Sequence, residues 1–339
     1  MRLPTRSSNW LPCHDGRPLA KDAMPMMQKT AIAEPGHDPR IHVNLHQLVA
    51  LRRRASRLTF LPRQPANSVL NGRHTSKLRG RGLNFEELRA YLPGDDIRTL
   101  DWKVTARTGT PHVRVYTEER DRPTLLLIDQ RMSMFFGSQV YMKSVIAAEA
   151  AAIAAHLVLA QGDRVGGLVF SDDAIAEHRP VRSPLALRRL LASIADANER
   201  LSARNQATRP DLFNRMLRSA TRIAKTNYLV LIFSDFDGVD AGSEPLIRGL
   251  ARHNDVLLFN IADPMATHVP ANARLAISDG AMQAEIDSSS AETHKQIEAF
   301  AQDRLALIRG WAQKYQLPFL PLSTQSPSLD QISHLLGAS

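Results

Sequence analysis

The sequence Thr-Leu-Leu-Leu-Ile-Asp at residues 124–129 is a continuous apolar run that ends in an acid. The sequence Tyr-Leu-Val-Leu-Ile-Phe-Ser-Asp at residues 228–235 repeats this pattern further along the chain. A strand that is apolar at every position has to be covered on both faces, which is the environment of a parallel sheet between two layers of helices. The two runs therefore predict neighbouring strands at the centre of such a sheet.

Strands and helices alternate outward from these two runs. Further strands are predicted at residues 164–170, 174–181 (an edge strand), 255–262 and 317–322, and helices at 140–160, 185–197, 212–224, 246–252 and 292–315. The dipeptide Asp279-Gly280 predicts a hairpin between strands 274–278 and 282–286. This alternation is typical of an α/β fold, here a doubly wound, mostly parallel sheet flanked by helices. Acids that end such strands meet at the carboxyl edge of the sheet, where sites in these folds collect.

Composition divides the chain into four parts. Residues 1–40 contain six prolines and no sustained hydrophobic period, which predicts a disordered basic tail. Residues 41–122 are predicted to hold a helix capped by Asn44 and a smaller strand and loop module. Residues 123–325 form the sheet domain, with the hairpin inserted near 272–287, and residues 326–339 form a C-terminal helix or tail.

The net charge of +9 is concentrated near the N-terminus. Residues 1–80 contain 14 Lys and Arg against 4 Asp and Glu, whereas the other 259 residues contain 29 against 30. The favoured interpretation is a merely solvated tail. The alternative is a segment that contacts anionic lipid, nucleic acid or an acidic partner, with phosphate contacts from Arg52, Arg53, Arg54 and Arg57. An aromatic content of 6% argues against a stacking platform for single-stranded nucleic acid, so we do not expect a nucleic-acid partner for the neutral body.

Two observations indicate a cytoplasmic protein. The single cysteine, Cys13, excludes an internal disulfide and any zinc site built from several cysteines. The most apolar stretch, residues 145–160, is interrupted by Glu149 and His156 and predicts a buried helix rather than a membrane span. We therefore expect no integral membrane span.

A group of oxygen-bearing side chains follows the two central strands. Asp129 is followed four residues later by Ser133, Asp235 ends the second run, and Thr208 lies in the loop before the helix predicted at 212–224. Oxygen ligands from separate loops suit Mg²⁺, which keeps several waters in its shell. The alternative is that these acids only cap the N-termini of neighbouring helices.

The order and spacing of these four residues resemble the metal-ion-dependent adhesion site of von Willebrand factor A-like domains. Upstream, the sequence Arg89-Ala-Tyr-Leu-Pro-Gly-Asp95-Asp96-Ile-Arg98-Thr-Leu-Asp101-Trp102-Lys-Val-Thr-Ala-Arg107 resembles the signature of the bacterial "domain of unknown function 58" family. The resemblance continues through residues 115–119 and 162–165. It implies a von Willebrand factor A-like sheet domain with a metal site at Asp129, Ser133, Thr208 and Asp235.

One residue departs from the family pattern. Arg131 stands at the middle serine of the family's Asp-x-Ser-x-Ser motif, and a guanidinium cannot ligate a cation. If Arg131 points inward, it can pair with Asp129 or Asp235 and replace the metal with an internal salt bridge. If it points outward, the remaining ligands can still bind Mg²⁺ weakly. The sequence leaves both alternatives open.

The signature segment contains several opposite charges close together. We expect Arg89 and Arg107 to form two-pronged pairs with carboxylates, and Trp102 to anchor the segment against the body. The Pro-Gly pair favours a tight turn, and the acids after it, Asp95 and Asp96, can accept from backbone N–H groups. Adjacent acids in a strand would point to opposite sides, and no nucleophile–base pair accompanies them, so catalysis by this pair is not expected. Structural ion pairing and partner binding are compatible readings here. The candidate partner-binding residues are Arg89, Asp95, Asp96, Arg98, Asp101, Trp102 and Arg107.

Motifs of common enzymes are absent from the sequence: it has no Gly-x-x-x-x-Gly-Lys phosphate loop, no Gly-x-Ser-x-Gly elbow and no His-Glu-x-x-His helix. We therefore expect a non-enzymatic protein-binding module that docks through the carboxyl edge of the sheet. The family resemblance implies an adaptor or co-chaperone for a MoxR-type AAA+ ATPase. The alternative is binding of nucleic acid or an anionic membrane by the basic N-terminal segment. A metal-dependent hydrolase based on Asp129, Asp235 and the pair Asp95-Asp96 is less favoured.

Overall fold

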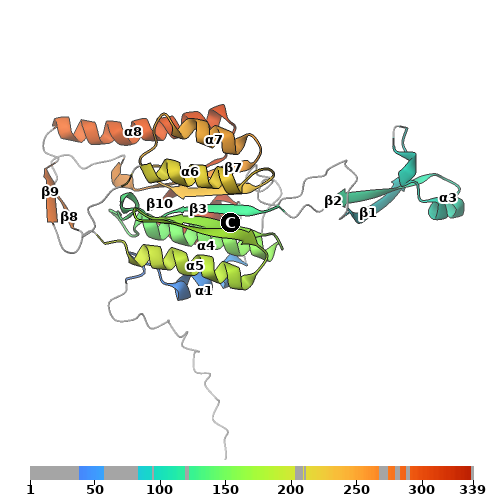
Figure 1. The fold of residues 1–339 in the computed structure, drawn as a ribbon, viewed down its shortest axis with the longest axis horizontal. Helices are drawn as coiled ribbons and strands as arrows, with labels where there is room; N and C mark the ends of the chain where they lie inside the picture. Colours follow the sequence, from blue (N-terminus) through green and yellow to red (C-terminus); the bar gives the residue numbers. More distant parts are fainter. Residues whose placement is uncertain are drawn as a thin grey trace, which may run out of the picture. The chain divides into compact units, whose positions relative to one another are not determined.

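The computed structural model describes most of the sheet domain and parts of the N-terminal region (Figure 1). The described residues are 38–56, 83–93, 95–118, 122–202, 209, 211–266, 274–278, 283–287 and 291–336. Of the predicted features, the tail up to residue 37, Arg57, Thr208 and the turn dipeptide Asp279-Gly280 lie outside the described residues.

A six-stranded sheet forms the centre of the fold. Its strands lie in the order β10 (Phe319–Ser323), β7 (Asp255–Ala262), β6 (Leu229–Ser234), β3 (Thr124–Asp129), β4 (Val165–Phe170) and β5 (Ile175–Val181). Every neighbouring pair is parallel except β4 and β5, which are antiparallel at the edge. The predicted mostly parallel α/β sheet is confirmed.

The chain winds outward from β3 in both directions. It first proceeds to β4 and the edge strand β5, and then returns to β6 and continues to β7 and β10. The strand order therefore reverses between β3 and β6, which pair in register with Ile128 opposite Phe233. In doubly wound sheets, ligands bind at the carboxyl ends of the strands where this reversal occurs. Asp129 is the last residue of β3 and Asp235 follows β6, the two strands that flank the reversal.

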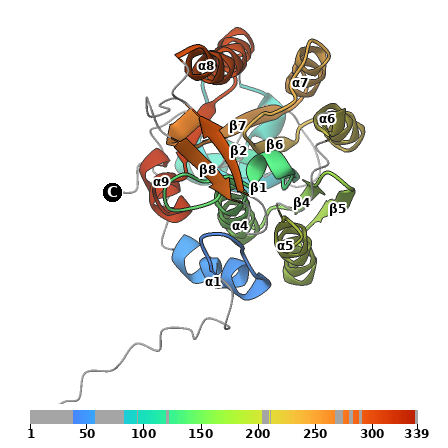
Figure 2. The same cartoon turned by 90° about the vertical axis from the view of Figure 1, so that its left-hand side faces the viewer.

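Helices cover both faces of the sheet (Figure 2). One layer contains α1 (Leu45–Ala55), α4 (Lys143–Ala160), α5 (Pro184–Glu199) and α9 (Ser328–Leu335), and the other contains α6 (Asp211–Ile223), α7 (Ser243–Ala251) and α8 (Ala291–Lys314). A hydrophobic core lies on each face of the sheet, and strand β3 contributes to both. Leu126 and Ile128 pack toward the first layer, and Leu125 and Leu127 pack toward the second. All four side chains are fully buried, as expected for a continuous apolar run between two layers.

Helix α4 occupies the middle of its layer. In the part of the chain that the structure describes, it is the one helix long and apolar enough to cross a membrane, and 72% of it is buried as a core helix. It begins at Lys143 rather than at the predicted residue 140. The residues before it form a loop instead, because the amide of Tyr141 donates to the carbonyl of Thr324 and the amide of Met142 to that of Arg40.

The signature segment forms a small antiparallel module. Strands β1 (Leu83–Ala90) and β2 (His112–Glu118) pair with each other, and the connection between them holds the short 3₁₀ helix η1 (Ile97–Thr99) and the helix α3 (Trp102–Thr108). As expected for acids that follow a turn, Asp95 and Asp96 each accept a backbone N–H group, from Leu92 and Arg98. The amide of Asp95 bonds to the carbonyl of Leu92 in a turn, and Asp96 caps η1. The predicted hairpin is present as β8 (Arg274–Ser278) and β9 (Gln283–Asp287).

Candidate functional site

A buried ion pair lies at the end of β3. The Arg131 side chain folds back onto Asp129, with its Nε 3.0 Å from Oδ1 and its Nη2 2.7 Å from Oδ2. The backbone amide of Arg131 also donates to Oδ1 at 3.1 Å. Asp129 is fully buried and Arg131 is 2% exposed. Two parallel N–H···O bonds of this kind form the strongest type of carboxylate contact.

Aromatic rings enclose the guanidinium of Arg131. Its central carbon lies 5.3 Å from the ring centre of Phe170, at the end of β4, and 5.6 Å from that of Phe213 in α6. Nη2 also donates to the backbone carbonyl of Asp237 at 3.0 Å. Of the two orientations that the sequence leaves open, the structure has the inward one.

A second buried pair lies at the end of β6. Lys143, the first residue of α4, places its Nζ 2.6 Å from Oδ2 of Asp235. The other oxygen of Asp235 accepts the amide of Asp237 at 3.0 Å and lies 3.4 Å from the Ser133 hydroxyl. Lys143 and Asp235 are 9% and 6% exposed. Lys143 was not among the predicted site residues, because a lysine near the start of a predicted helix has no distinguishing pattern.

Ser234 and Phe236 join the two pairs. The Ser234 hydroxyl donates to Oδ2 of Asp129 at 2.6 Å and accepts the amide of Phe236 at 2.9 Å. Phe236 has a φ of 57°, a left-handed conformation that costs a bulky residue about 1–3 kcal/mol. Its buried ring packs edge-to-face against Phe213 at 5.9 Å. The left-handed backbone conformation at Phe236 is therefore held by buried contacts.

The two acids differ in their proton affinity. Burial raises the pKa of the Asp129 carboxyl, while the Arg131 guanidinium acts in the opposite direction. Burial also acts to raise the pKa of Asp235, but the charges of Lys143 and Arg304 outweigh it and lower this pKa to about 2. Asp235 is therefore a carboxylate at neutral pH, and its charge is neutralised within the protein.

A third acid, Asp263, follows β7 at the same edge and was not among the predicted site residues. Its oxygens accept the amide and hydroxyl of Ser138, the hydroxyl of Thr324 at 2.6 Å and the amide of Met265 at 2.9 Å. Asp263 is 2% exposed, and although burial acts to raise its pKa, the hydrogen bonds from Ser138 and its other donors lower it. The available signal was that this acid ends an apolar strand, as Asp129 and Asp235 do.

The arrangement at these strand ends does not fit a divalent cation. Of the predicted ligands, Asp129, Ser133 and Asp235 lie together, and Thr208 is outside the described residues. Both oxygens of Asp129 receive donors from Arg131, and Oδ2 of Asp235 contacts an ammonium group. Within the described ranges, no three His, Cys, Asp or Glu side chains are arranged to hold a metal ion. Two side-chain cations thus stand where a metal would need free carboxylate oxygens.

Two acids of the signature module are used for internal ion pairs. Arg89 contacts both oxygens of Asp95, at 2.7 and 2.8 Å, and its hydrogen bonds lower the pKa of that carboxyl to about 2. Asp101 caps α3 by accepting the amides of Lys103 and Val104, and it also accepts Nε of Arg114 at 2.8 Å. The contacts of Asp95 and Asp101 are therefore those expected of structural ion pairing.

Two residues of the module, Trp102 and Arg107, do not make the contacts expected of them. Trp102 is 71% exposed, so the expectation that it anchors the module against the body is wrong. The capping of α3 by Asp101 places Trp102 at the first helical position with its side chain outward. Arg107 is exposed and has no ion pair within the described residues, and the same holds for Arg98.

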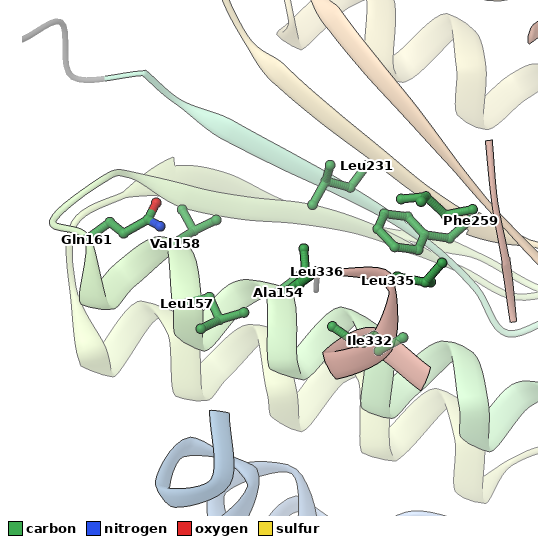
Figure 3. Close-up of a pocket in the computed structure, with 11 residues that line it drawn as sticks. Ala154, Leu157, Val158, Gln161, Leu231, Phe259, Ile332, Leu335 and Leu336 are labelled. Atoms are coloured by element: carbon green, nitrogen blue, oxygen red, sulfur yellow. The ribbon is translucent and has the colours of Figure 1, made fainter. Parts of the chain in front are cut away.

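An apolar hollow lies away from these strand ends, toward the C-terminal half of α4 (Figure 3). Leu157 and Val158 of α4, Phe259 of β7 and Ile332 of α9 contribute to its lining, and Gln161 is the polar residue among its lining residues. The hollow contains no titratable side chain, so it offers no acid, base or nucleophile for chemistry.

Comparison with known proteins identifies relatives of the chain. The family model described as "Protein of unknown function DUF58" matches residues 87–306. The uncharacterized proteins Rv1480 of Mycobacterium tuberculosis and Mb1516 of Mycobacterium bovis are each 31% identical to the chain over 213 residues. These matches cover 63% of this chain and 65% of each relative, less than two thirds of the relatives' length.

Among solved structures, a conserved hypothetical protein, BatB from Bacteroides thetaiotaomicron, aligns with 64% of this chain and 100% of its own chain. The TM-score is 0.36 and the sequence identity is 14%. A likeness of this size carries no conclusion about site or activity.

Removing the cation of the first pair should strongly destabilise the fold. Arg131→Met leaves the Asp129 carboxyl buried without its partner, and we expect a loss of about 3–5 kcal/mol in the free energy of unfolding, measured by urea denaturation. The matched control is Arg40→Met, which breaks a two-pronged pair with Asp38 at the surface and should cost less than about 1 kcal/mol. Equal losses of unfolding free energy in the two variants would contradict the expectation that breaking the buried pair costs more than breaking the surface pair.

Magnesium should not stabilise the wild-type protein. We expect the same Tm in excess Mg²⁺ and in EDTA, because Arg131 and Lys143 occupy the carboxylate oxygens. In Arg131→Ser, the freed Asp129 should bind Mg²⁺, which would appear as a Mg²⁺-dependent rise in Tm and as heat in titration calorimetry. A Tm rise in the wild type that disappears in Asp129→Asn would show that the carboxylates do bind the ion.

Acid should weaken the second pair. The pKa of Asp235 is about 2 in the folded protein against an ordinary 3.8, so its stabilisation is complete above about pH 5 and is lost as the pH falls through 4 toward 2. Asp235→Asn should remove about 2 kcal/mol of this pH dependence of the unfolding free energy. Lys143→Met should flatten the same part of the profile. Unchanged profiles in both variants would contradict the pairing.

Proposed function

The chain belongs to the DUF58 family, and we propose that it is a non-enzymatic protein-binding module. In this proposal its sheet domain is von Willebrand factor A-like, and it serves as a cytoplasmic adaptor or co-chaperone for a MoxR-type AAA+ ATPase. The docking surface is the carboxyl edge of the sheet, beside the reversal of strand order between β3 and β6. The proposal combines the family resemblance of the sequence with the geometry of the strand ends.

One observation carries the proposal: the charged groups at the strand ends are bound to each other. Asp129, Arg131, Lys143 and Asp235 are each 9% exposed or less, and each has a partner of opposite charge within 3 Å. A general acid or base has to reach the substrate within hydrogen-bond distance. Groups buried in mutual ion pairs do not meet this requirement. The pairs at the strand ends are therefore better suited to hold the neighbouring loops in place than to catalyse a reaction.

The loop between β3 and α4 is the surface that these pairs support. Ser138 is bound through its amide and hydroxyl to Asp263, the amide of Met132 donates to Asp172 at 2.6 Å, and the amide of Tyr141 donates to the carbonyl of Thr324 at 3.0 Å. Val140 is 43% exposed within this loop. A loop tied to three other strand ends loses little freedom on binding, which favours recognition by a preformed surface.

The other candidate functions have less support. The basic segment is described only in part: α1 buries Leu48, Leu51 and Ala55 and exposes Arg52, Arg53 and Arg54. This is the ordinary pattern of a surface helix. A hydrolase would need a free carboxylate, whereas Asp95 is bound by Arg89 and Asp96 caps η1. We therefore keep protein binding as the proposal.

Affinity purification tests both the partner and the surface. The tagged chain, incubated with native lysate and ATP or a non-hydrolysable analogue, should retain an AAA+ ATPase identified by mass spectrometry. Val140→Glu should lower the recovery at least about tenfold, because a buried interface charge costs more than 1.4 kcal/mol.

The chain offers a matched control at the other edge of the sheet. Val181 is 41% exposed and pairs with Val165 at the start of β4, so Val181→Glu places the same charge at the opposite edge. This variant should recover the ATPase as the wild type does. If no AAA+ protein is recovered with either nucleotide, the proposed ATPase partner is contradicted. If recovery is lost in Val181→Glu and not in Val140→Glu, the proposed docking surface is contradicted.

A further inference from the structure

The signature module exposes large apolar side chains. Trp102 and Ile97 are 71% and 64% exposed, the highest values for large hydrophobic residues in the described part of the chain, and Leu92 is 59% exposed. These three residues lie within eleven positions of the sequence. Grouped exposed apolar side chains mark interaction sites, and tryptophan is enriched at them because its large ring loses little freedom on binding.

Capping interactions hold these side chains outward. Asp101 caps α3 through the amides of Lys103 and Val104, and its pair with Arg114 attaches the start of the helix to β2. Asp96 caps η1 and places Ile97 at its first position. No residue of α3 or η1 is buried. The exposure of Trp102 and Ile97 is therefore set by a hydrogen-bonded frame.

The charges of the module are unequally neutralised. Asp95 and Asp101 are paired with Arg89 and Arg114 inside the module. Arg98, Lys103 and Arg107 are exposed, and no described residue forms an ion pair with them. The surface beside the apolar side chains is therefore basic.

The helical spacing brings the two properties together. Lys103 and Arg107 are four residues apart and share one side of α3, while Trp102 and Ala106, also four apart, share the adjacent side. Arg98 follows Ile97 in η1. We define the tryptophan face as the exposed residues Leu92, Ile97, Arg98, Trp102, Lys103 and Arg107.

We propose that the tryptophan face binds a short acidic segment of a protein that carries an apolar side chain among its carboxylates. The apolar side chain would pack on Trp102 and Ile97, and the carboxylates would pair with Arg98, Lys103 and Arg107. A few anchor residues suit a short segment better than a folded domain, which buries about 800 Å² on each partner. The inference does not depend on the ATPase or on the carboxyl edge.

Charge favours a protein segment over an anionic membrane. Three basic residues contribute only about 1 kcal/mol each at an anionic lipid surface. The exposed carboxylate of Asp96 lies between Asp95 and Ile97 in the same turn and would be repelled by a continuous layer of negative headgroups. A peptide can place its acids beside the three cations and leave Asp96 in water.

Peptide binding to the full chain tests the inference. The probe is a fluorescently labelled peptide in which Glu alternates with Leu and Phe, and the matched control peptide has Lys in place of every Glu. We expect a saturable rise in anisotropy with the acidic peptide that weakens with salt, and none with the basic peptide. Vesicles of phosphatidylcholine with phosphatidylserine should not cosediment with the chain through this face.

Variants locate the binding. Trp102→Ala should weaken the acidic peptide at least about tenfold, and so should Lys103→Glu with Arg107→Glu. Leu307→Ala, at a 43% exposed residue of α8, should bind as the wild type does. Because Trp102, Lys103 and Arg107 are exposed, circular dichroism should be unchanged in these variants. Absence of peptide binding, wild-type affinity in Trp102→Ala, or vesicle binding lost in Trp102→Ala would each overturn the proposal.

Discussion

The bidentate pair between Asp129 and Arg131 is the contact on which the strand ends depend. It lies where the strand order reverses, is excluded from water, and is enclosed by Phe170 and Phe213. Replacing such a pair with apolar residues is often tolerated, but a single buried charge is not. The pair therefore adds little net stability. Its effect is to restrict the fold to conformations in which the Asp129 carboxylate and the Arg131 guanidinium are in contact. Ser234 extends that requirement to β6.

The second pair and the third acid continue the same logic along the carboxyl edge. Lys143 attaches the start of α4 to the end of β6, and Asp263 attaches the loop at Ser138 to the end of β7. The ends of β3, β6 and β7 are thus each connected to a neighbouring segment by a carboxylate. A bound metal ion can connect loops in the same way only while it is present, whereas side-chain cations are permanent. In the signature module the acids also fix the backbone, and there they leave apolar and basic side chains exposed.

Much of the fold could be predicted because its signals are local. The continuous apolar runs of β3 and β6 require burial on both faces, and the bounds predicted for β3 and β7 agree with the structure. The helix predicted from residue 140 begins at Lys143, because distant carbonyls of Arg40 and Thr324 hold the preceding amides in a loop. The outward orientation of Trp102 was not predicted, because an aromatic residue in a charged segment suggests an anchor. The cap formed by Asp101 places Trp102 at the first position of α3 with its side chain exposed.

The amino-acid sequence alone determined the α/β architecture, the family and the position of two acids at the ends of central strands, because hydrophobic period and motif spacing are properties of neighbouring residues. Tertiary structure decided the direction of Arg131, the pairing of Lys143 with Asp235 and the use of Asp263 as a loop anchor. Lys143 and Asp235 are 92 residues apart in sequence, and Asp263 and Ser138 are 125 apart. Whether such side chains meet depends on which strands become neighbours and how far each loop reaches, and that geometry exists only after the sheet has formed.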